Sequence, residues 1–481
     1  MRTRLFLYLL GWVSIEAGAA LLLPAPFSLA DGDGILWAFV LPAVCFFAVG
    51  FRMVHAGREH PERVLVREGA CLLVGAWLLL TVSASLPYML SGVLSFPDAL
   101  SEGVSGITTT RLTLLGSDAP RSLIFWRSLT QWFGGAYIIL LLVTIVPQVA
   151  EWFGMSLVMP RGRSGGQLLP SMRRLARRVF GVYAGATAAF ALVFAVLGLS
   201  AFDALNLSMV TLATGGCFEA APLEGMRGML LSLALMIAML FSAGNFLVYA
   251  EVIRRHSFSE AGGSGEMKMM LVVAAAAGLL VSLHLWTSGT YGFGEGLHHG
   301  FFAAAAFLST TGTEPTQLVG WPDFDRFVLL LLAFVGGSMV SSSGGLKILR
   351  LAALMNASVM ELRRTLHPRM MLRISALGHV VPLATVEQHL SFFALYVAVF
   401  FGAAIILSLF GLEPLSALGL SAACLTSAGP AALIAGDVDI YTALGTGERL
   451  FCAALMLLGR FEVFTFLFAI QSFISRWERR W

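Results

Sequence analysis

The loop Ser309-Thr310-Thr311-Gly312 consists of small residues, follows a short apolar segment and lies between two apolar segments of membrane-spanning length. Three other stretches resemble it in composition and setting: Thr108-Thr109-Thr110-Arg111, Ala213-Thr214-Gly215-Gly216 and Ser427-Ala428-Gly429-Pro430. In chain order they are loops one to four. A single loop of this kind is weak support for any fold, but four at equivalent places indicate a repeated structural unit.

The composition is that of a membrane protein. Of the 481 residues, 58% are hydrophobic and only 12% are charged, with a mean hydropathy of +0.83. A soluble protein carries roughly twice that charged fraction. The segment after Met1 stays apolar to about Leu23, which is long enough to span a bilayer, so no cleavable signal peptide is expected.

The sequence predicts an all-α polytopic membrane protein with ten transmembrane helices and four half-penetrating segments. Two N-terminal transmembrane helices are followed by four repeats of membrane helix, pore loop and membrane helix, with a period of about 100 residues, far longer than that of a solenoid repeat. We expect the helix pair at residues 1–60 and the repeats at 61–150, 171–256, 266–370 and 380–481.

Basic residues alternate along the chain in a way that predicts its orientation. Every second connection carries several arginines, as at Arg173 and Arg174 or at Arg363 and Arg364. Cytoplasmic connections are the ones enriched in Lys and Arg. We therefore expect both termini in the cytoplasm and all four loops on the outer side of the membrane.

The loops have the composition of a cation filter. Irregular backbone at membrane depth is tolerated only where protein buries it or water reaches it, and glycine allows successive carbonyls to turn toward one axis. Backbone carbonyls so placed can replace the hydration shell of a cation. Loop one departs from the pattern, because Arg111 stands where the other loops have glycine.

A second irregular stretch interrupts one of the predicted spans. The broken segment, Gly336–Lys347, reads Gly-Gly-Ser-Met-Val-Ser-Ser-Ser-Gly-Gly-Leu-Lys and lies between two apolar halves. Glycine and serine hold a helix poorly, so we expect a buried break that Lys347 anchors. The residues taken as a gate are Gly336, Gly337, Ser341, Ser342, Ser343, Gly344, Gly345, Lys347 and Arg460.

Charged residues inside predicted spans indicate polar partners or cavities. Arg460 and Glu462 interrupt the last span, and Arg460 has two open interpretations: it binds carbonyls of the broken segment, or it forms a direct barrier to cations. Arg127 is interpreted as structural, paired with a carboxylate such as Glu102.

Three stretches resemble the TrkH/KtrB/HKT superfamily of potassium and sodium transporters, most closely its bacterial TrkH type. They are FWRSLTQWFGG at Phe125–Gly135, LKILR at Leu346–Arg350 and LLGRFEVF at Leu457–Phe464. The resemblance covers nearly the whole chain. It implies one pore per subunit around a pseudo-fourfold axis, a homodimer in the lipid bilayer, and a separate cytosolic nucleotide-binding regulatory subunit of the TrkA type. It also implies that the broken segment obstructs the pore below the filter.

The resemblance assigns the ion-contacting backbone as well. The carbonyls that would bind K+, or Na+, are those of Thr109, Thr110, Ala213, Thr214, Thr310, Thr311, Ser427 and Ala428. The filter glycines are Gly215, Gly312 and Gly429, with Arg111 in place of the first. The transported ion is the only cofactor expected.

Arg111 leaves two functions open. The first is passive, gated translocation of K+, with Arg111 turned away from the ion axis and paired with an outer-mouth carboxylate, Glu314 first and Glu219 second. The second is a non-conducting or altered-selectivity subunit retained as a regulator or scaffold. A secondary transporter with inverted repeats is disfavoured, because all four repeats begin inside. No nucleophile–base or metal-ligand spacing indicates an enzyme, and no nucleic-acid partner is expected.

Overall fold

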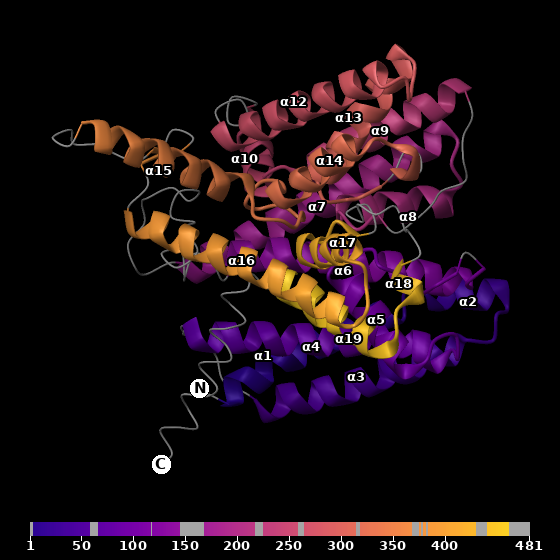
Figure 1. Cartoon of the computed structure of the whole chain (residues 1–481). Helices are drawn as coiled ribbons and strands as arrows, with labels where there is room; N and C mark the ends of the chain where they lie inside the picture. Colours follow the sequence, from indigo (N-terminus) through magenta and orange to yellow (C-terminus); the bar gives the residue numbers. More distant parts are fainter. Residues whose placement is uncertain are drawn as a thin grey trace. The chain divides into compact units, whose positions relative to one another are not determined.

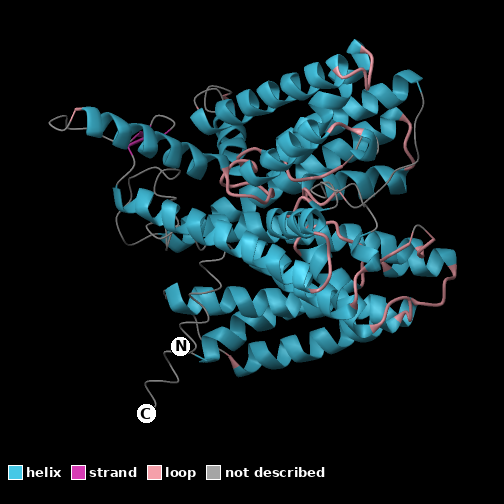
Figure 2. Cartoon of the chain, viewed as in Figure 1, coloured by secondary structure: helices cyan, strands magenta, loops and turns pink. Residues whose placement is uncertain are grey.

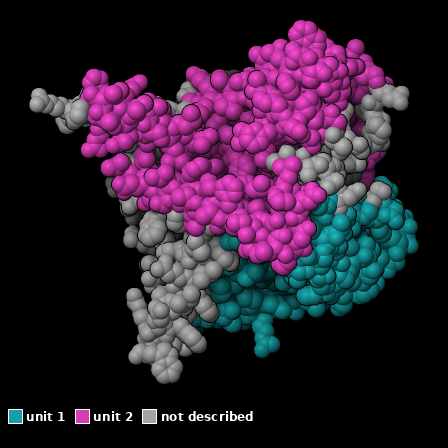
Figure 3. Space-filling view, in the orientation of Figure 1, with its two compact units in different colours: residues 1–131, 439–481 teal, residues 132–438 magenta. Residues whose placement is uncertain are grey.

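The computed structural model describes residues 3–57, 66–116, 118–144, 168–216, 225–257, 264–313, 318–367, 375–376, 379–380, 383–429 and 440–460 (Figure 1). The chain divides into two compact units (Figure 3). Unit 1 comprises Met1–Gln131 and Asp439–Trp481, and unit 2 comprises Trp132–Val438. Helices make up almost all of the described elements (Figure 2).

Unit 1 holds the N-terminal helix pair, most of the first repeat and the end of the fourth. Its elements are α1 (Thr3–Leu21), α2 (Ala25–Asp31), α3 (Leu36–Ala56), α4 (Val66–Leu90), α5 (Phe96–Ile107), the first part of α6 (Arg121–Thr144), α18 (Ile440–Ala443) and α19 (Thr446–Arg460).

Small residues allow α1 and α3 to lie in close contact. A β-carbon at Gly50 would lie 2.7 Å from the side chain of Ile15, and one at Gly11 would lie 2.9 Å from the carbonyl oxygen of Gly50. Such close backbone approach is the usual packing mode of membrane helices, where apolar burial gives no preference for helix over lipid. The two N-terminal helices therefore form a tight pair.

The connection between α2 and α3 is tied to the start of α6 inside unit 1. The carboxylate of Asp33 accepts hydrogen bonds from Ser122 Oγ at 2.7 Å, from the Ile35 N–H at 3.1 Å and from the Ser28 hydroxyl. Partial burial acts to raise the pKa of Asp33, but these hydrogen bonds outweigh it and leave the pKa below its ordinary value.

Unit 2 holds the second and third repeats and most of the fourth. Its elements are the remainder of α6, α7 (Leu168–Leu197), α8 (Ala201–Leu212), α9 (Gly225–Ala243), α10 (Phe246–Arg255), α12 (Gly265–Thr287), α13 (Phe293–Leu308), the 3₁₀ turn η3 (Leu318–Gly320), α14 (Asp323–Val335), α15 (Ile348–Leu366), the antiparallel pair β1 (Ser375–Ala376) and β2 (His379–Val380), α16 (Leu383–Leu409) and α17 (Pro414–Thr426).

The same two-helix unit recurs four times. A long helix packs against the short helix that follows it in the pairs α4–α5, α7–α8, α12–α13 and α16–α17, and Figure 1 shows α13 beside α12. Each short helix runs into one of the four loops. The predicted all-α repeat architecture is confirmed.

Seven described helices are long and apolar enough to cross a membrane. They begin at Thr3, Leu36, Cys71, Arg174, Gly225, Gly265 and Thr385. Large apolar side chains on their outer faces are exposed, for example Val196 at 79% and Leu409 at 81%. In a soluble protein such faces would be covered, whereas lipid tails solvate them.

The second membrane helix is interrupted in two repeats. In the third repeat α14 ends at Val335 and α15 begins at Ile348, so the broken segment occupies the expected residues. In the second repeat a further interruption, at Gly244 and Asn245, separates α9 from α10. The sequence analysis did not identify this second interruption.

Candidate functional site

The four loops share one unusual backbone conformation. The first left-handed residue of each is Thr109, Thr214, Thr310 or Ser427, with φ between 56° and 58°. Two residues later the backbone is left-handed again, at Arg111 (φ 70°), Gly216 (57°), Gly312 (63°) and Gly429 (64°). Positive φ is rare for β-branched residues and persists only where the surroundings impose it. Its recurrence shows that the loops are equivalent.

Hydrogen bonds at the helix ends repeat with the same spacing. The N–H of Thr109 donates to the carbonyl of Gly106, and that of Thr110 donates to the carbonyl of Ser105, both at 3.0 Å. In loop two Thr214 donates to Thr211 at 3.0 Å and Gly215 to Val210 at 2.8 Å. This is the Schellman termination of a helix, in which glycine usually takes the left-handed position. Here threonine takes it.

The shared backbone corrects the register expected for loop two and the first residue of loop four. Gly216, and not Gly215, is equivalent to Arg111, so Thr214 and Gly215 correspond to Thr109 and Thr110. Loop four runs from Thr426 to Gly429, one residue earlier than the quoted stretch. Pro430 lies outside the described residues.

Hydroxyl groups brace three of the loops internally. The side-chain oxygens of Thr108 and Thr110 lie 2.8 Å apart, as do those of Ser309 and Thr311. In loop four the N–H of Ala428 donates to Thr426 Oγ1 at 3.3 Å. Loop two has Ala213 at the corresponding place and lacks that hydroxyl.

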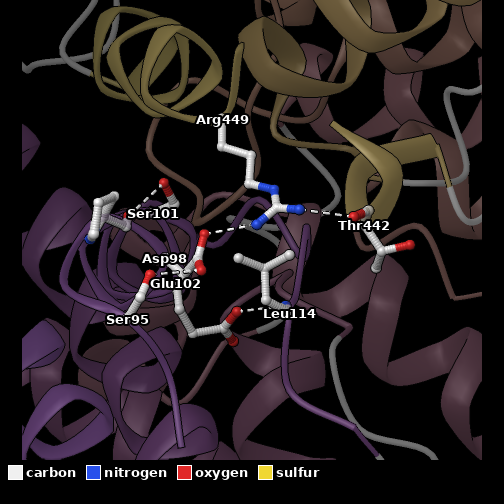
Figure 4. Close-up of polar contacts among 8 residues, drawn as sticks. Ser95, Asp98, Ser101, Glu102, Leu114, Thr442 and Arg449 are labelled. Carbon is white, nitrogen blue, oxygen red and sulfur yellow. Dashed lines mark hydrogen bonds and ion pairs between the residues drawn. The ribbon is translucent and has the colours of Figure 1, made fainter. Parts of the chain in front are cut away.

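A buried polar cluster in unit 1 holds the chain just after loop one. Glu102, on α5, accepts from the Leu114 N–H at 2.7 Å (Figure 4). It also accepts from Thr113 Oγ1 at 2.8 Å. Arg127 Nη1 donates to the same Thr113 hydroxyl at 3.1 Å. Glu102 and Arg127 also attract each other through their charges. The structural interpretation of Arg127 therefore agrees with this geometry, with Thr113 as the shared partner.

Arg111 itself is half-buried and has a left-handed backbone. The carboxylates expected to pair with it, Glu314 and Glu219, both lie outside the described residues. Their pairing with Arg111 stays a prediction.

The broken segment is buried in unit 2 and is anchored by Lys347. Ser341 and Ser342 are fully buried, and Lys347 is 6% exposed. The Lys347 ammonium donates to Ser341 Oγ and Ser343 Oγ, each at 3.2 Å, and to the carbonyl oxygen of Ser343. An ammonium group has three protons to donate, which suits a turn whose carbonyls and hydroxyls need partners.

Three loops meet the broken segment within unit 2. Thr214 Oγ1 donates to the carbonyl of Ser342 at 3.0 Å, and the Gly344 N–H donates to Thr310 Oγ1 at 2.8 Å. A β-carbon at Gly344 would lie only 2.0 Å from the carbonyl oxygen of Thr426. The left-handed threonines of loops two and three thus bind this segment directly, and loop four touches it.

The remaining gate residue lies in unit 1. Arg460 is 4% exposed at the end of α19, and Glu462 lies outside the described residues. Both interpretations of Arg460 stay predictions.

Sequence reasoning missed three polar residues that the structure brings into buried or half-buried contacts: Asn245, Glu266 and Arg449. Glu266 accepts a hydrogen bond from Met339 of the broken segment and another from the Asn245 side chain. Arg449 donates to Asp98 at the start of α5. The available signal was the presence of polar residues at the ends of apolar segments, which usually have partners there.

Repeated pore loops, together with a buried interruption against three of them, define a multi-pass membrane protein of the pore-loop type. The TrkH family profile, described as cation transport protein, matches residues 37–474. The chain belongs to the TrkH family of cation transport proteins.

Individual relatives match over nearly the full length. The Trk system potassium uptake proteins TrkH of Halomonas elongata and Escherichia coli K12 are each 29% identical, covering 97% of this chain and 98% of the relative. The crystal structure of the potassium transporter TrkH from Vibrio parahaemolyticus superposes with a TM-score of 0.87 at 27% identity, covering 97% of this chain and 98% of that one.

Proposed function

We propose that this chain passes K+ across the bacterial cytoplasmic membrane through a filter made by its four loops. The observation that carries the proposal is the shared left-handed backbone of the loops, since equivalent loops can present equivalent carbonyls to one dehydrated ion. The buried hydroxyl oxygens of Thr109 and Ser427 have no hydrogen-bond partner among the described residues, which leaves them to contact a cation. Relatives named as potassium uptake proteins support K+ as the ion.

The broken segment is the proposed gate. Its contacts with loops two, three and four support this assignment, because a segment bound to the loops could obstruct an ion leaving the filter. A homodimer and a separate cytosolic nucleotide-binding subunit of the TrkA type complete the proposal, with both termini in the cytoplasm. The names of the relatives, which place them in a Trk system, support the additional subunit.

The position of the Arg111 side chain decides between K+ translocation and the second candidate function, a non-conducting subunit. Two unit charges about 4 Å apart interact by roughly 4 kcal/mol at an effective dielectric near 20. A guanidinium aimed at the ion would therefore lower cation occupancy by about a thousandfold. Conduction requires the side chain of Arg111 to turn away or to be neutralised, and Glu314 is the first proposed partner.

Potassium-dependent growth of a host without its own potassium uptake tests the proposal. We expect the wild type to restore growth at low potassium, Glu314→Gln to impair it, and Arg111→Gly to restore it in that background. A silent wild type that Arg111→Gly alone opens, with Glu314→Gln having no effect, would show that Arg111 blocks the filter. A wild type and Arg111→Gly variant that both reach the membrane without supporting growth would contradict K+ translocation.

A further inference from the structure

The broken segment has a second set of contacts, separate from those it makes with the loops. Residues 342–344 meet the loops and residues 337–340 meet the interruption between α9 and α10, while Ser342 Oγ also lies 3.2 Å from the carbonyl oxygen of Ser242 near the end of α9. The Ser338 N–H donates to the carbonyl of Ala243 at 2.8 Å, and the Phe246 N–H donates to the carbonyl of Val340 at 2.9 Å. A β-carbon at Gly337 would lie 2.6 Å from the carbonyl oxygen of Ala243. The two interruptions therefore pack backbone to backbone.

Glu266 joins these two interruptions through its side chain. It lies in the first turn of α12 and is 6% exposed. Its Oε1 accepts from the Met339 N–H at 2.5 Å, and its Oε2 accepts from Asn245 Nδ2 at 3.0 Å. Both oxygens of this carboxyl group therefore act as hydrogen-bond acceptors. Lys347, at the far end of the broken segment, attracts the same carboxylate.

Asn245 connects Glu266 to the start of α10. It is 1% exposed, and its Oδ1 accepts from the Leu247 N–H at 3.0 Å, which caps the helix. The oxygen of its side-chain amide thus binds α10, and the nitrogen binds Glu266. A displacement of α10 must either break the hydrogen bond from the Asn245 side-chain amide to Glu266 or move Met339 as well.

We propose that Glu266 is a latch that couples α10 to the broken segment and holds that segment in its obstructing position. This inference rests on the proposed function, since it gives the gate a positioning residue outside the gate itself. Loss of the latch removes the side-chain contact that holds Met339. The 338–340 end then keeps its backbone hydrogen bonds to Ala243 and Phe246, and Lys347 still holds the other end. The latch acts on opening and leaves ion binding in the loops unchanged.

An exchange of donor and acceptor provides the test. Glu266→Gln turns an amide group toward the amide of Asn245, and Asn245→Asp turns a second carboxylate toward Glu266, so each single change breaks the contact. In the double variant the new amide donates to the new carboxylate, while the carboxylate still caps α10. We expect rubidium-86 uptake by proteoliposomes without regulatory subunit to rise about tenfold in each single variant, the effect of one lost charge-assisted hydrogen bond. The double variant should return toward the wild-type rate.

Controls separate the latch from general damage and from the proposed function. Glu251→Gln makes the same chemical change at a partly exposed carboxylate on α10 and should leave uptake unchanged. The potassium concentration for half-maximal uptake should be the same in all variants. The latch proposal is overturned if uptake by the double variant stays as high as in the single variants, or if its yield of folded protein is no higher than theirs. If deletion of Ser341–Ser343 permits rubidium uptake but the single variants take up rubidium at the wild-type rate, the latch proposal is rejected and the proposed function stands. If no variant takes up rubidium, the proposed function is rejected.

Discussion

At the scale of single residues, the choice of threonine at the left-handed positions has a physical explanation. A left-handed backbone costs a non-glycine residue roughly 1–2 kcal/mol, which glycine would avoid. Glycine has no hydroxyl, however, and the hydroxyls of Thr214 and Thr310 are the groups that bind Ser342 and Gly344. Threonine therefore exchanges some backbone strain for a direct contact between the loops and the broken segment.

Gly216 is required for a different reason, and Gly216→Ala should show it. Arg111 proves that a side chain is compatible with this backbone angle, but a β-carbon at Gly216 would lie 2.2 Å from the carbonyl oxygen of Thr311. The backbone of loop two or three must move. We expect a loss of roughly 1–2 kcal/mol in unfolding free energy from φ alone, and further loss from the displacement, with reduced preference for K+ over Na+.

The matched control is Gly185→Ala in α7, where a β-carbon would meet nothing within 4 Å. Thermal unfolding in detergent and rubidium uptake against competing sodium measure both variants. Equal behaviour of the two variants would show that the contact between loops two and three is unimportant.

The residue-scale errors of the sequence interpretation have a local cause. Gly215 and Gly216 are adjacent, so either could take the place of Arg111, and composition alone does not choose between them. The choice depends on where α8 ends, and helix boundaries are the least certain part of such a reading. In loop three a single glycine, Gly312, left one register, and that register is confirmed.

At the scale of elements, the short helix α5 is held at its start by α19 within unit 1. Arg449 Nη1 lies 2.6 Å from Asp98 Oδ1, and its Nη2 donates to the carbonyl of Thr442 at 2.7 Å (Figure 4). Ser95 Oγ donates to the other oxygen of Asp98 at 2.7 Å. Asp98 in the first turn also suits the positive end of the helix dipole. The start of α5 is thus fixed from two sides.

Arg449→Ala should therefore destabilise the protein. The Arg449 and Asp98 side chains are 18% and 23% exposed, and hydrogen bonds to charged groups contribute about 1.5–3 kcal/mol each where they are shielded from water. We expect a loss of about 2 kcal/mol, seen as a lower melting temperature in detergent, and a smaller loss for Asp98→Asn.

Arg121→Ala provides the comparison, because Arg121 pairs with Asp31 at 3.3 Å but is 54% exposed. Exposed pairs contribute at most about 1 kcal/mol. If Arg449→Ala and Arg121→Ala shifted the melting temperature equally, the special role of the Arg449 contact would be refuted.

One of the two helix interruptions could be predicted and the other could not. Eight glycines and serines in the broken segment weaken helix formation by composition alone. The α9–α10 interruption contains only Gly244 and Asn245 in an apolar stretch, and single glycines occur within many membrane helices. Asn245 is held in place by Glu266, which is distant in sequence, so the cause of this break is tertiary.

At the scale of the whole molecule, the repeat architecture was predictable because lipid imposes a strong pattern on sequence. A spanning helix needs about 20 apolar residues. Apolar segments of this length therefore mark each repeat in the sequence. Contacts within each unit, such as that of Arg449 with Asp98, depend on how segments pack, and the hydrophobic pattern contains no information about them.

Orientation in the membrane is the last prediction, and α12 offers a direct test. Its 23 residues span about 34 Å at ~1.5 Å per residue, which exceeds a hydrocarbon core of about 30 Å. Arg255 precedes α12 in a basic connection, and the exposed Thr290 follows it. In a background with all five cysteines replaced, we expect a cysteine at position 290 to react with a membrane-impermeant maleimide in intact cells. A cysteine at position 255 should react only after permeabilisation. Because a single helix separates the two positions, the reverse pattern would invert the whole topology, and equal labelling of both in intact cells would mean that α12 does not span.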